Sequence, residues 1–341
     1  MAVGDSPSTA RPFEAASGVA SPPGFAIRHL RRPADYPEMN RIINDVRAHI
    51  GDEWTTTDEQ FGSFYDAGGR FDPDRDVAVV ELDGRIVGYA RCAVNVEVSG
   101  LHVYELFTFL DVALDSEPMF PVLLEVMERH ARTLAATDSA PKVLQTFGGD
   151  TAPELDRLVR AAGFEPVRYG YTMVRPHLDD LPDAPMPAGL EIREVRPDHL
   201  RAIYDASVEA FVDDWDAREP TDEDWDEFLH DPVQSDTTLW RVAWDRDRVA
   251  GQVRSYIDPN ENARYGRLRG HTEHISVGRE WRRRGLARAL IAASFPLLRA
   301  RGMTEAALGV DTENVSGALR VYERCGFVPV SRSTTFRKPL V

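Results

Sequence analysis

The densest group of side chains suited to chemistry lies between residues 271 and 290, where an alternating strand ends near Val277 and a helix begins near Gly285. The first turn of a helix offers unpaired N–H groups and the positive end of the dipole, so it can hold an anion. Gly285 lacks a Cβ and permits close backbone approach, while Ala287 keeps a second crowded position small. Four arginines surround this turn: Arg282, Arg283, Arg284 and Arg288. These residues predict a pyrophosphate-binding turn rather than a solvated basic loop.

Two motifs in this region resemble the GNAT acyltransferase family. Arg282-x-x-Gly285-x-Ala287 matches the family's acyl-CoA signature, Arg/Gln-x-x-Gly-x-Gly/Ala, and a second block runs from Asn314 through Tyr322 to Gly326-Phe327. The signature alone is weakly specific, whereas the two blocks at this separation are strongly specific. The resemblance implies an N-acetyltransferase that uses acetyl-CoA as co-substrate, needs no metal and acylates a primary amine of a small molecule or peptide by direct attack.

The resemblance also implies roles for individual residues. The turn would bind the pyrophosphate of acetyl-CoA through backbone N–H groups, and the strand before it would bind the pantetheine arm. Asn314 would contact the pantetheine, and Tyr322 would protonate the departing CoA thiolate, although its ring can also serve the core. The turn residues are Arg282, Arg283, Arg284, Gly285, Leu286 and Ala287, and the strand residues are Ile275, Ser276 and Val277.

A general base is also required, because an amine must be neutral to attack a thioester and a typical amine is protonated at pH 7. The family keeps such a base at the positions of His271 and Glu273, which alternation places on one face of the strand. Either group can titrate near neutral pH. We favour Glu273 because it is closer to the reacting carbonyl, and His271 stays open as base or as a polar strand-end residue. Where the mycothiol synthase group of the family keeps a glutamate, this chain has His271, which leaves the acceptor undefined.

The acceptor pocket is expected from the first helical region of the C-terminal half, which mixes acids with aromatic side chains. Such a mixture suits a cationic amine. A solvated helix face with a few core tryptophans explains the same residues equally well. They are Phe211, Asp213, Asp214, Trp215, Asp216, Glu219, Glu223, Asp224, Trp225 and Phe228.

The elements that must position these residues occur twice in the chain. Gly163-Phe164 and Gly326-Phe327 each close a helix and lead into a strand 163 residues apart, and Gly88 and Gly251 share that offset. Strands alternate with helices in each half, which predicts an α/β fold class with two equivalent domains. The resemblance implies that these are two tandem GNAT-fold domains, each a mixed, mostly antiparallel sheet flanked by helices. The expected division is a disordered leader at 1–24, a degenerate GNAT-like domain at 25–176, a Pro-rich linker at 177–187 and a catalytic domain at 188–341.

The N-terminal half has lost the acyl-CoA site if the offset of 163 holds throughout. It places Met119, Val122 and Leu124 at the signature positions, Val159 at the place of Tyr322, and Leu110 at the place of Glu273. Asp115 and Glu117 would repel a pyrophosphate, and prolines at 118 and 121 remove N–H donors. One acyl-CoA per chain is therefore expected, with a structural role for this half.

Composition narrows the remaining classes. The net charge of −16 argues against nucleic acid as a partner, and no stretch approaches about 18 uninterrupted apolar residues, so no membrane span is expected. Two distant cysteines, Cys92 and Cys325, give neither a zinc motif nor a disulfide framework. We expect a soluble cytoplasmic monomer or homodimer. One alternative is a non-catalytic sensor that binds CoA or another ligand on the same fold, and another is a transferase of longer acyl or aminoacyl groups. A dinucleotide-binding fold is poorly supported, because no Gly-x-Gly-x-x-Gly follows a first strand in this sequence.

Overall fold

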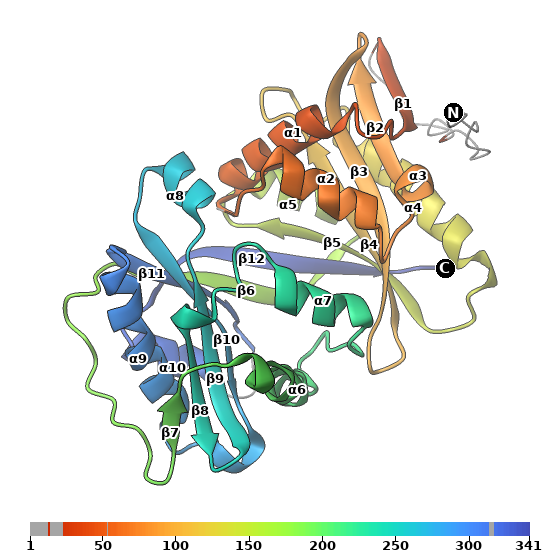
Figure 1. Cartoon of the computed structure of the whole chain (residues 1–341). Coiled ribbons are helices and arrows are strands. Elements are labelled where there is room, and N and C mark those ends of the chain that lie inside the picture. The colour runs from red at the N-terminus through yellow and green to blue at the C-terminus, as the bar shows by residue number, and fades with distance from the viewer. Residues whose placement is uncertain (1–12, 14–22, 53, 314–316) are drawn as a thin grey trace, which may run out of the picture. The chain divides into compact units, whose positions relative to one another are not determined.

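The computed structural model describes residues 13, 23–52, 54–313 and 317–341, and its elements are labelled in Figure 1. The chain forms two compact units: unit 1 is Met1–Val167 with Thr334–Val341, and unit 2 is Arg168–Ser333. The leader predicted at 1–24 falls outside the described residues except for Phe13, Pro23 and Gly24.

Unit 1 is a twisted sheet with helices on both faces. Its strand order is β1-β2-β3-β4-β5, followed by the end of β12. The strands are β1 (Phe25–His29), β2 (Val77–Leu82), β3 (Arg85–Val96), β4 (His102–Leu110), β5 (Lys142–Gly149) and β12 (Val328–Pro339). The helices are α1 (Tyr36–Ile50), α2 (Asp58–Ala67), α3 (Pro73–Asp76), α4 (Phe120–Leu134) and α5 (Pro153–Ala161), and a 3₁₀ turn (Ala135–Thr137) follows α4.

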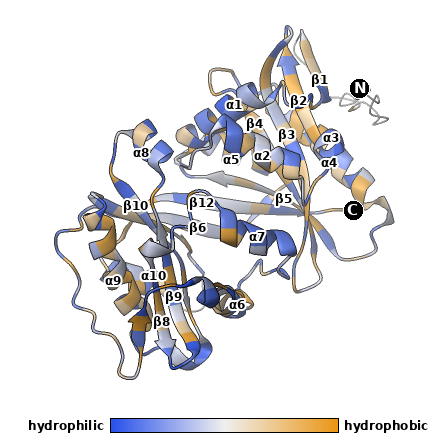
Figure 2. Ribbon diagram, viewed as in Figure 1, coloured by the Kyte–Doolittle hydropathy of each residue, from blue (hydrophilic) through white to orange (hydrophobic). Residues whose placement is uncertain are grey.

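Local sequence explains the main elements of unit 1. The apolar run Val77–Val80 is fully buried, as expected for a strand covered on both faces, and β2 and β3 are largely orange in Figure 2. Helix α2 begins with a capping box, in which Thr57 and Gln60 exchange side-chain to backbone hydrogen bonds of 2.8 and 3.2 Å. Helices α1 and α2 pack on one face of the sheet, and α4 packs on the other.

Unit 2 repeats this plan. Its strand order is β6-β11-β10-β9-β8-β7, and the first residues of β12 lie beside β6. The strands are β6 (Glu165–Arg175), β7 (Glu191–Arg193), β8 (Trp240–Asp245), β9 (Arg248–Tyr256), β10 (Arg269–Val277) and β11 (Glu305–Asp311). The helices are α6 (Leu200–Phe211), α7 (Asp222–His230), α8 (Pro259–Tyr265), α9 (Leu286–Ala300) and α10 (Ala318–Arg324), with 3₁₀ turns at Pro197–His199, Thr237–Leu239 and Arg279–Trp281.

The predicted fold class is confirmed. Each unit has a mixed sheet in which β4–β5 and β10–β11 pair in parallel, whereas the other strand pairs with a described register are antiparallel. In unit 2 one core packs α9 and α10 against the sheet, and a second core packs α6 and α7 against its other face.

The compact units do not coincide with the division expected from the sequence. The expected domains, 25–176 and 188–341, would keep β6 in the first unit and all of β12 in the second. Instead, residues 170–175 of β6 pair with β11 of unit 2, and residues from Thr334 onward belong to unit 1. The hydrophobic pattern identifies β6 and β12 as strands but does not specify the strand beside which each one lies. The sequence therefore could not predict that β6 pairs in unit 2 and that the end of β12 belongs to unit 1.

The single offset of 163 is wrong for β4 and β10. Gly88 pairs with Leu110, and the equivalent Gly251 pairs with Val277, which follows Leu110 by 167 positions. Helix α8 lies in the longer β9–β10 connection. In this register Arg91 of β3 is equivalent to Arg254 of β9. Arg91 pairs with Phe107 and Arg254 pairs with Glu273. Glu273 therefore corresponds to Phe107 and not to Leu110.

Candidate active site

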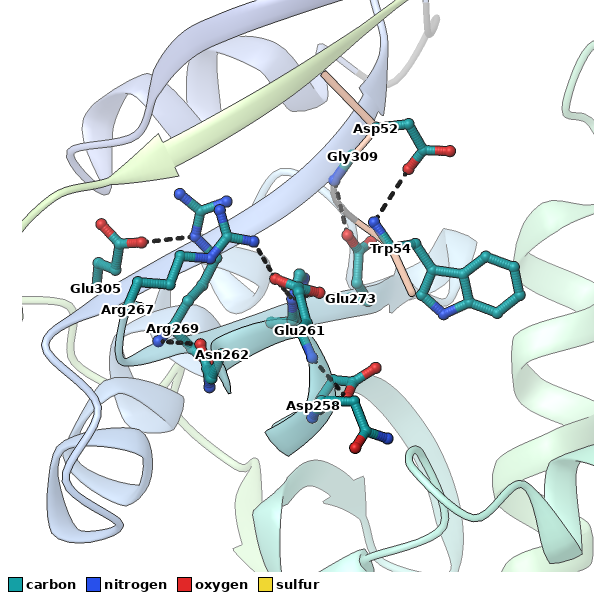
Figure 3. Close-up of polar contacts among 12 residues, drawn as sticks. Asp52, Trp54, Asp258, Glu261, Asn262, Arg267, Arg269, Glu273, Glu305 and Gly309 are labelled. Atoms are coloured by element: carbon teal, nitrogen blue, oxygen red, sulfur yellow. Dashed lines mark hydrogen bonds and ion pairs between the residues drawn. The ribbon is translucent and has the colours of Figure 1, made fainter. Parts of the chain in front are cut away.

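Strand β10 parts from its neighbour β11 at the centre of unit 2. Parallel pairing joins Arg269 to Glu305 and continues as far as His271 and Ala307 in the described register. Two residues later, the Glu273 side chain occupies the position of a ladder partner, because the Gly309 N–H donates to its Oε1 at 2.7 Å (Figure 3). The gap between two parallel strands is thus bridged by a carboxylate.

A β-bulge shapes the second half of β10. The register with β9 shifts between Glu273 and Ser276, and His274 in the bulge has a left-handed φ of 49°. Its Nε2 lies 2.7 Å from Gln234 Oε1. Burial, together with the nearby Arg254 cation, lowers the pKa of His274 to about 3, so this imidazole stays neutral.

Glu273 is poised to exchange protons near neutral pH. Burial raises the pKa of its carboxyl group to about 7, while the nearby His271 and the hydrogen bond from the Gly309 N–H act in the opposite direction. A carboxylate with such a pKa is half ionised at pH 7 and retains enough basicity to accept a proton from an amine.

His271 lies on the same face of β10 but is already engaged. Its Nε2 is 2.9 and 3.0 Å from the two carboxylate oxygens of Glu261, and its ring stacks on Tyr256 with centroids 4.6 Å apart. Glu261, on α8, is 2% exposed and also pairs with Arg267 (Figure 3). Burial raises the pKa of Glu261, but the bonds to His271 and Arg267 outweigh it and hold the value below normal.

Tyr322 sits in the core of unit 2 on helix α10. It is 7% exposed, and its ring meets that of Phe327 edge-on at 6.4 Å. Burial raises the pKa of its hydroxyl, and the nearby Glu273 carboxylate raises it further, which indicates that the two groups share one electrostatic environment. Cys325, one turn away, is fully buried, and burial raises its thiol pKa to about 11, as expected for an inert thiol.

The predicted anion-binding turn has the required backbone. Arg283 and Gly285 adopt left-handed φ values of 60° and 85°, and α9 begins at Leu286. The Ala289 N–H bonds to the Gly285 carbonyl, so the three preceding N–H groups, of residues 286–288, have no helical acceptor. A Cβ placed on Gly285 would meet no atom within 4 Å, which leaves that side of the turn open.

Two of the four arginines around the turn hold it in place. Arg282 donates from Nε to the Val277 carbonyl at 3.0 Å and from Nη2 to the Ala210 carbonyl at 3.2 Å. Arg284 donates to the Ala188 carbonyl at 3.1 Å. Arg282 therefore fixes the turn against the end of β10, a role that the sequence did not reveal. Asn314, predicted to contact pantetheine, lies outside the described residues.

The acids and aromatics proposed for the acceptor pocket divide into two groups. Asp224 forms a bidentate ion pair with Arg218, and Trp225 and Phe228 stack within the α6–α7 core. These residues fit the structural interpretation. Asp214 differs, because burial raises the pKa of its carboxyl group and the neighbouring Asp216 and Asp311 raise it further.

Residues outside the predicted set complete the site. Glu261, Arg267 and the Gly309 N–H were missed, because only the folded chain brings α8 and β11 beside β10. The Asp258-Pro259 pair in the sequence could have indicated the start of helix α8. Asp258 caps this helix by accepting hydrogen bonds from the Asn260 and Glu261 N–H groups. Within the described residues, no cluster of three or more His, Cys, Asp or Glu side chains is suited to a metal, and no helix has the length and apolarity of a membrane span.

The glycine at the turn provides a test of its role. Gly285→Val should weaken acetyl-CoA binding by about tenfold or more, because branched side-chain atoms would obstruct the backbone N–H groups. Calorimetry with acetyl-CoA measures this change. Gly302→Val is the matched control: Gly302 follows α9, has φ of 84° and has equally open space around its Cβ position. Equal affinities for the two variants would place the phosphates elsewhere.

Comparison with known proteins supports an acetyltransferase fold in unit 2. The acetyltransferase (GNAT) family matches residues 200–327. A mycothiol acetyltransferase of Thermobispora bispora is 27% identical over 209 residues, which are 61% of this chain and 70% of that protein. A GCN5-related N-acetyltransferase structure from Sphaerobacter thermophilus is 25% identical with a TM-score of 0.71, covering 94% of this chain and 97% of its own.

The tandem arrangement also has a structural counterpart. A tandem GNAT protein from the clavulanic acid biosynthesis pathway superposes with a TM-score of 0.62 at 16% identity, covering 93% of this chain and 99% of that one, which is a likeness of fold. The β10 gap, the left-handed turn before α9 and the doubled sheet agree with these similarities. Residues 200–327 match the GNAT family of acetyltransferases, whose members use acetyl-CoA as co-substrate, and the chain holds two tandem units of the GNAT fold.

Proposed function

We propose that this chain transfers an acetyl group from acetyl-CoA to a primary amine of a small molecule or peptide, and that unit 2 carries the reaction. The observation that carries the proposal is the Glu273 carboxylate at the gap between β10 and β11. Its pKa is raised to about 7 by burial, and it lies in the same electrostatic environment as Tyr322.

The proposed division of labour follows from the contacts. Backbone N–H groups of residues 283–287 hold the pyrophosphate of acetyl-CoA, and the β10 backbone at Ile275, Ser276 and Val277 holds its pantetheine arm. Acetyl-CoA supplies the activated acetyl group. Glu273 accepts a proton from the attacking amine, and Tyr322 donates one to the departing thiolate.

His271 is assigned a positioning role and not that of the base. The Nε2 proton is directed at the Glu261 carboxylate, and the ring is fixed by Tyr256, so the imidazole is oriented beside Glu273. Its positive electrostatic influence limits the rise in the Glu273 pKa. His271→Gln should therefore raise the pKa of Glu273 and move the midpoint of the acidic limb of the rate profile to higher pH, without abolishing that limb.

A screen of amines tests the proposed function. Purified full-length protein is incubated with acetyl-CoA and with aminoglycosides, amino-sugar thiols, peptides and polyamines, and free CoA thiol is measured. Amino-sugar thiols are included because the relative named above is a mycothiol acetyltransferase. Amine-dependent release of CoA supports the enzyme, and the acetylated product identifies the acceptor.

Unit 1 is proposed to hold no acyl-CoA. Helix α4 has Met119 at its N-cap, and the Met119 and Phe120 N–H groups already donate to the Ser116 carbonyl at 3.2 and 2.8 Å. The Glu117 N–H is taken by Asp115 at 3.0 Å, and these two carboxylates would repel a pyrophosphate. Pro121 has no N–H, so of the first turn of α4 only the Val122 N–H is left by these bonds, and the local charge is unfavourable.

Binding stoichiometry checks this assignment. Calorimetry on the full chain should give one acetyl-CoA per chain for the wild type. The intact chain is needed because residues from Thr334 onward belong to unit 1, so a fragment ending near residue 180 lacks part of its sheet. Two equivalents per chain, or a second tight phase that persists in Gly285→Val, would contradict it.

A further inference from the structure

A partly buried cationic cluster in unit 1 has no role in the reaction proposed above. It consists of Arg47 on α1, Tyr65 on α2, and Tyr89 and Arg91 on β3, and we name it the Arg47–Arg91 cluster. Tyr89 and Arg91 alternate onto the sheet face that α1 and α2 cover. Tyr65 and Tyr89 have ring centroids 6.4 Å apart, and Arg91 lies 6.0 Å from the Tyr65 ring.

Three polar atoms of the cluster are buried without a hydrogen-bond partner among the residues that the structure describes. They are Arg47 Nη1, Tyr89 Oη and Arg91 Nε. Buried donors are almost always paired, and leaving one unpaired costs about 1–3 kcal/mol, more for a charged group. The Tyr65 hydroxyl interacts with Tyr89 and Arg91 but leaves these three atoms without a partner, so one external acceptor could serve all three side chains.

The charges in the cluster point to an anion. Burial lowers the pKa of Arg47, and the neighbouring Arg91 cation lowers it as well. Asp52 and Tyr89 act in the opposite direction. Asp52 is the nearest carboxylate, but it stays 3.7 Å from Arg47 Nε and also accepts the Trp54 N–H at 3.3 Å (Figure 3). In the described chain, no ion pair to a carboxylate is formed by Arg91. Arg47 therefore faces a second cation, Arg91, while the carboxylate beside it lies outside hydrogen-bond distance of its Nε.

Aromatic rings leave only the edge of Arg91 free for a ligand. Its Cζ lies 4.3 Å from the Phe107 ring, 4.7 Å from Phe64 and 5.1 Å from Phe71. Rings stack on the faces of a guanidinium, so hydrogen bonds must come from the N–H edge, whose fork matches the two oxygens of a carboxylate or phosphate. Phe64 and Trp54 are 48% and 46% exposed, which places the cluster near the surface of the unit.

We propose that the Arg47–Arg91 cluster is a binding site for a small molecule that carries an oxyanion, either a carboxylate or a phosphate. The two guanidinium groups and the Tyr89 hydroxyl are its donors. The site lies on the sheet face covered by α1 and α2, opposite the face on which α4 packs, so it is separate from the turn before α4. It gives unit 1 a ligand of its own.

The test uses the full chain with two probes, inorganic phosphate and benzoate, against chloride at equal ionic strength. Calorimetry and thermal unfolding should show saturable binding of one anion per chain and a rise in Tm for at least one probe. The stronger probe identifies the group. Arg91→Met and Arg47→Met should each weaken that binding tenfold or more, whereas Arg129→Met, at an exposed i,i+4 pair with Glu125, should leave it unchanged.

The same variants separate binding from packing. In chloride alone, Arg91→Met should unfold at a Tm equal to or above that of the wild type, because methionine removes an unpaired buried charge and still fills the space between the rings. Absence of saturable binding by both probes overturns the proposal. So does an equal response of wild type and Arg91→Met, which would mean an adventitious ion only, or a lower Tm for Arg91→Met in chloride with no anion response in the wild type.

Discussion

Glu273→Gln should lower kcat for amine acetylation by about 10²–10⁴-fold, the usual contribution of a positioned general base. Glutamine retains a carbonyl oxygen that can accept the 2.7 Å hydrogen bond from the Gly309 N–H, so the gap between β10 and β11 should keep its geometry. Acetyl-CoA affinity should therefore change little, and the loss should appear in turnover.

The pH dependence makes this result specific. Glu273 must be ionised to accept a proton, and its pKa is raised to about 7, so wild-type kcat/KM should rise with pH up to about 7 and then level off. Glu273→Gln should lose that acidic limb. Glu305→Gln is a matched control, because Glu305 is a carboxylate on the adjoining strand that pairs with Arg269 at 2.7 Å. An intact limb in Glu273→Gln would remove Glu273 as the base.

Tyr322→Phe should also lower kcat by about 10²–10⁴-fold while leaving acetyl-CoA affinity nearly unchanged. Phenylalanine keeps the ring that packs against Phe327 in the core and removes only the proton donor. Single-turnover measurement of CoA thiol release follows the affected step directly.

Tyr104→Phe provides the control for that substitution. Tyr104 is a buried tyrosine of unit 1 whose hydroxyl bonds to Asp138 at 2.9 Å, and its loss should alter stability but not turnover. If Tyr322→Phe behaves in the same way as Tyr104→Phe, Tyr322 is a packing residue and another group protonates the thiolate.

The parts of the fold that depend on local sequence could be predicted. The strand ending at Val277, the helix starting after Gly285 and the two-fold repetition all follow from alternation, helix periodicity and glycine placement. The left-handed φ of Gly285 is the conformation that a glycine in a tight turn favours, and the turn has it.

The rest depends on contacts between distant segments. Nothing in the residues around Arg175 indicates that β6 joins β11, because strands pair through their backbones, which carry little sequence information. The bulge at His274 was also hidden, since a left-handed φ is uncommon for a residue other than glycine. The hydrogen bond between His271 and Glu261 depends on helix α8, which lies in the connection between β9 and β10. The extra residues of that connection are also the reason that the offset of 163 does not hold for β10.

These contacts favour one answer to the question that the residues alone left open. By spacing, His271 and Glu273 are equivalent candidates on one strand face. In the folded chain, Glu261 engages His271, while Glu273 faces the gap with a single backbone donor. The preference for Glu273 as the base therefore rests on what each side chain already bonds.

The most direct test of the central claim is mass spectrometry of an acetyl-transfer reaction with isotopically labelled acetyl-CoA and the amine panel. Labelled acetyl-amine and free CoA are expected in equal amounts, with no acetylated protein and with loss of both products in Glu273→Gln. If the wild type binds one acetyl-CoA per chain yet releases no CoA with any amine, the chain is a ligand-binding sensor on this fold, and the catalytic account is contradicted.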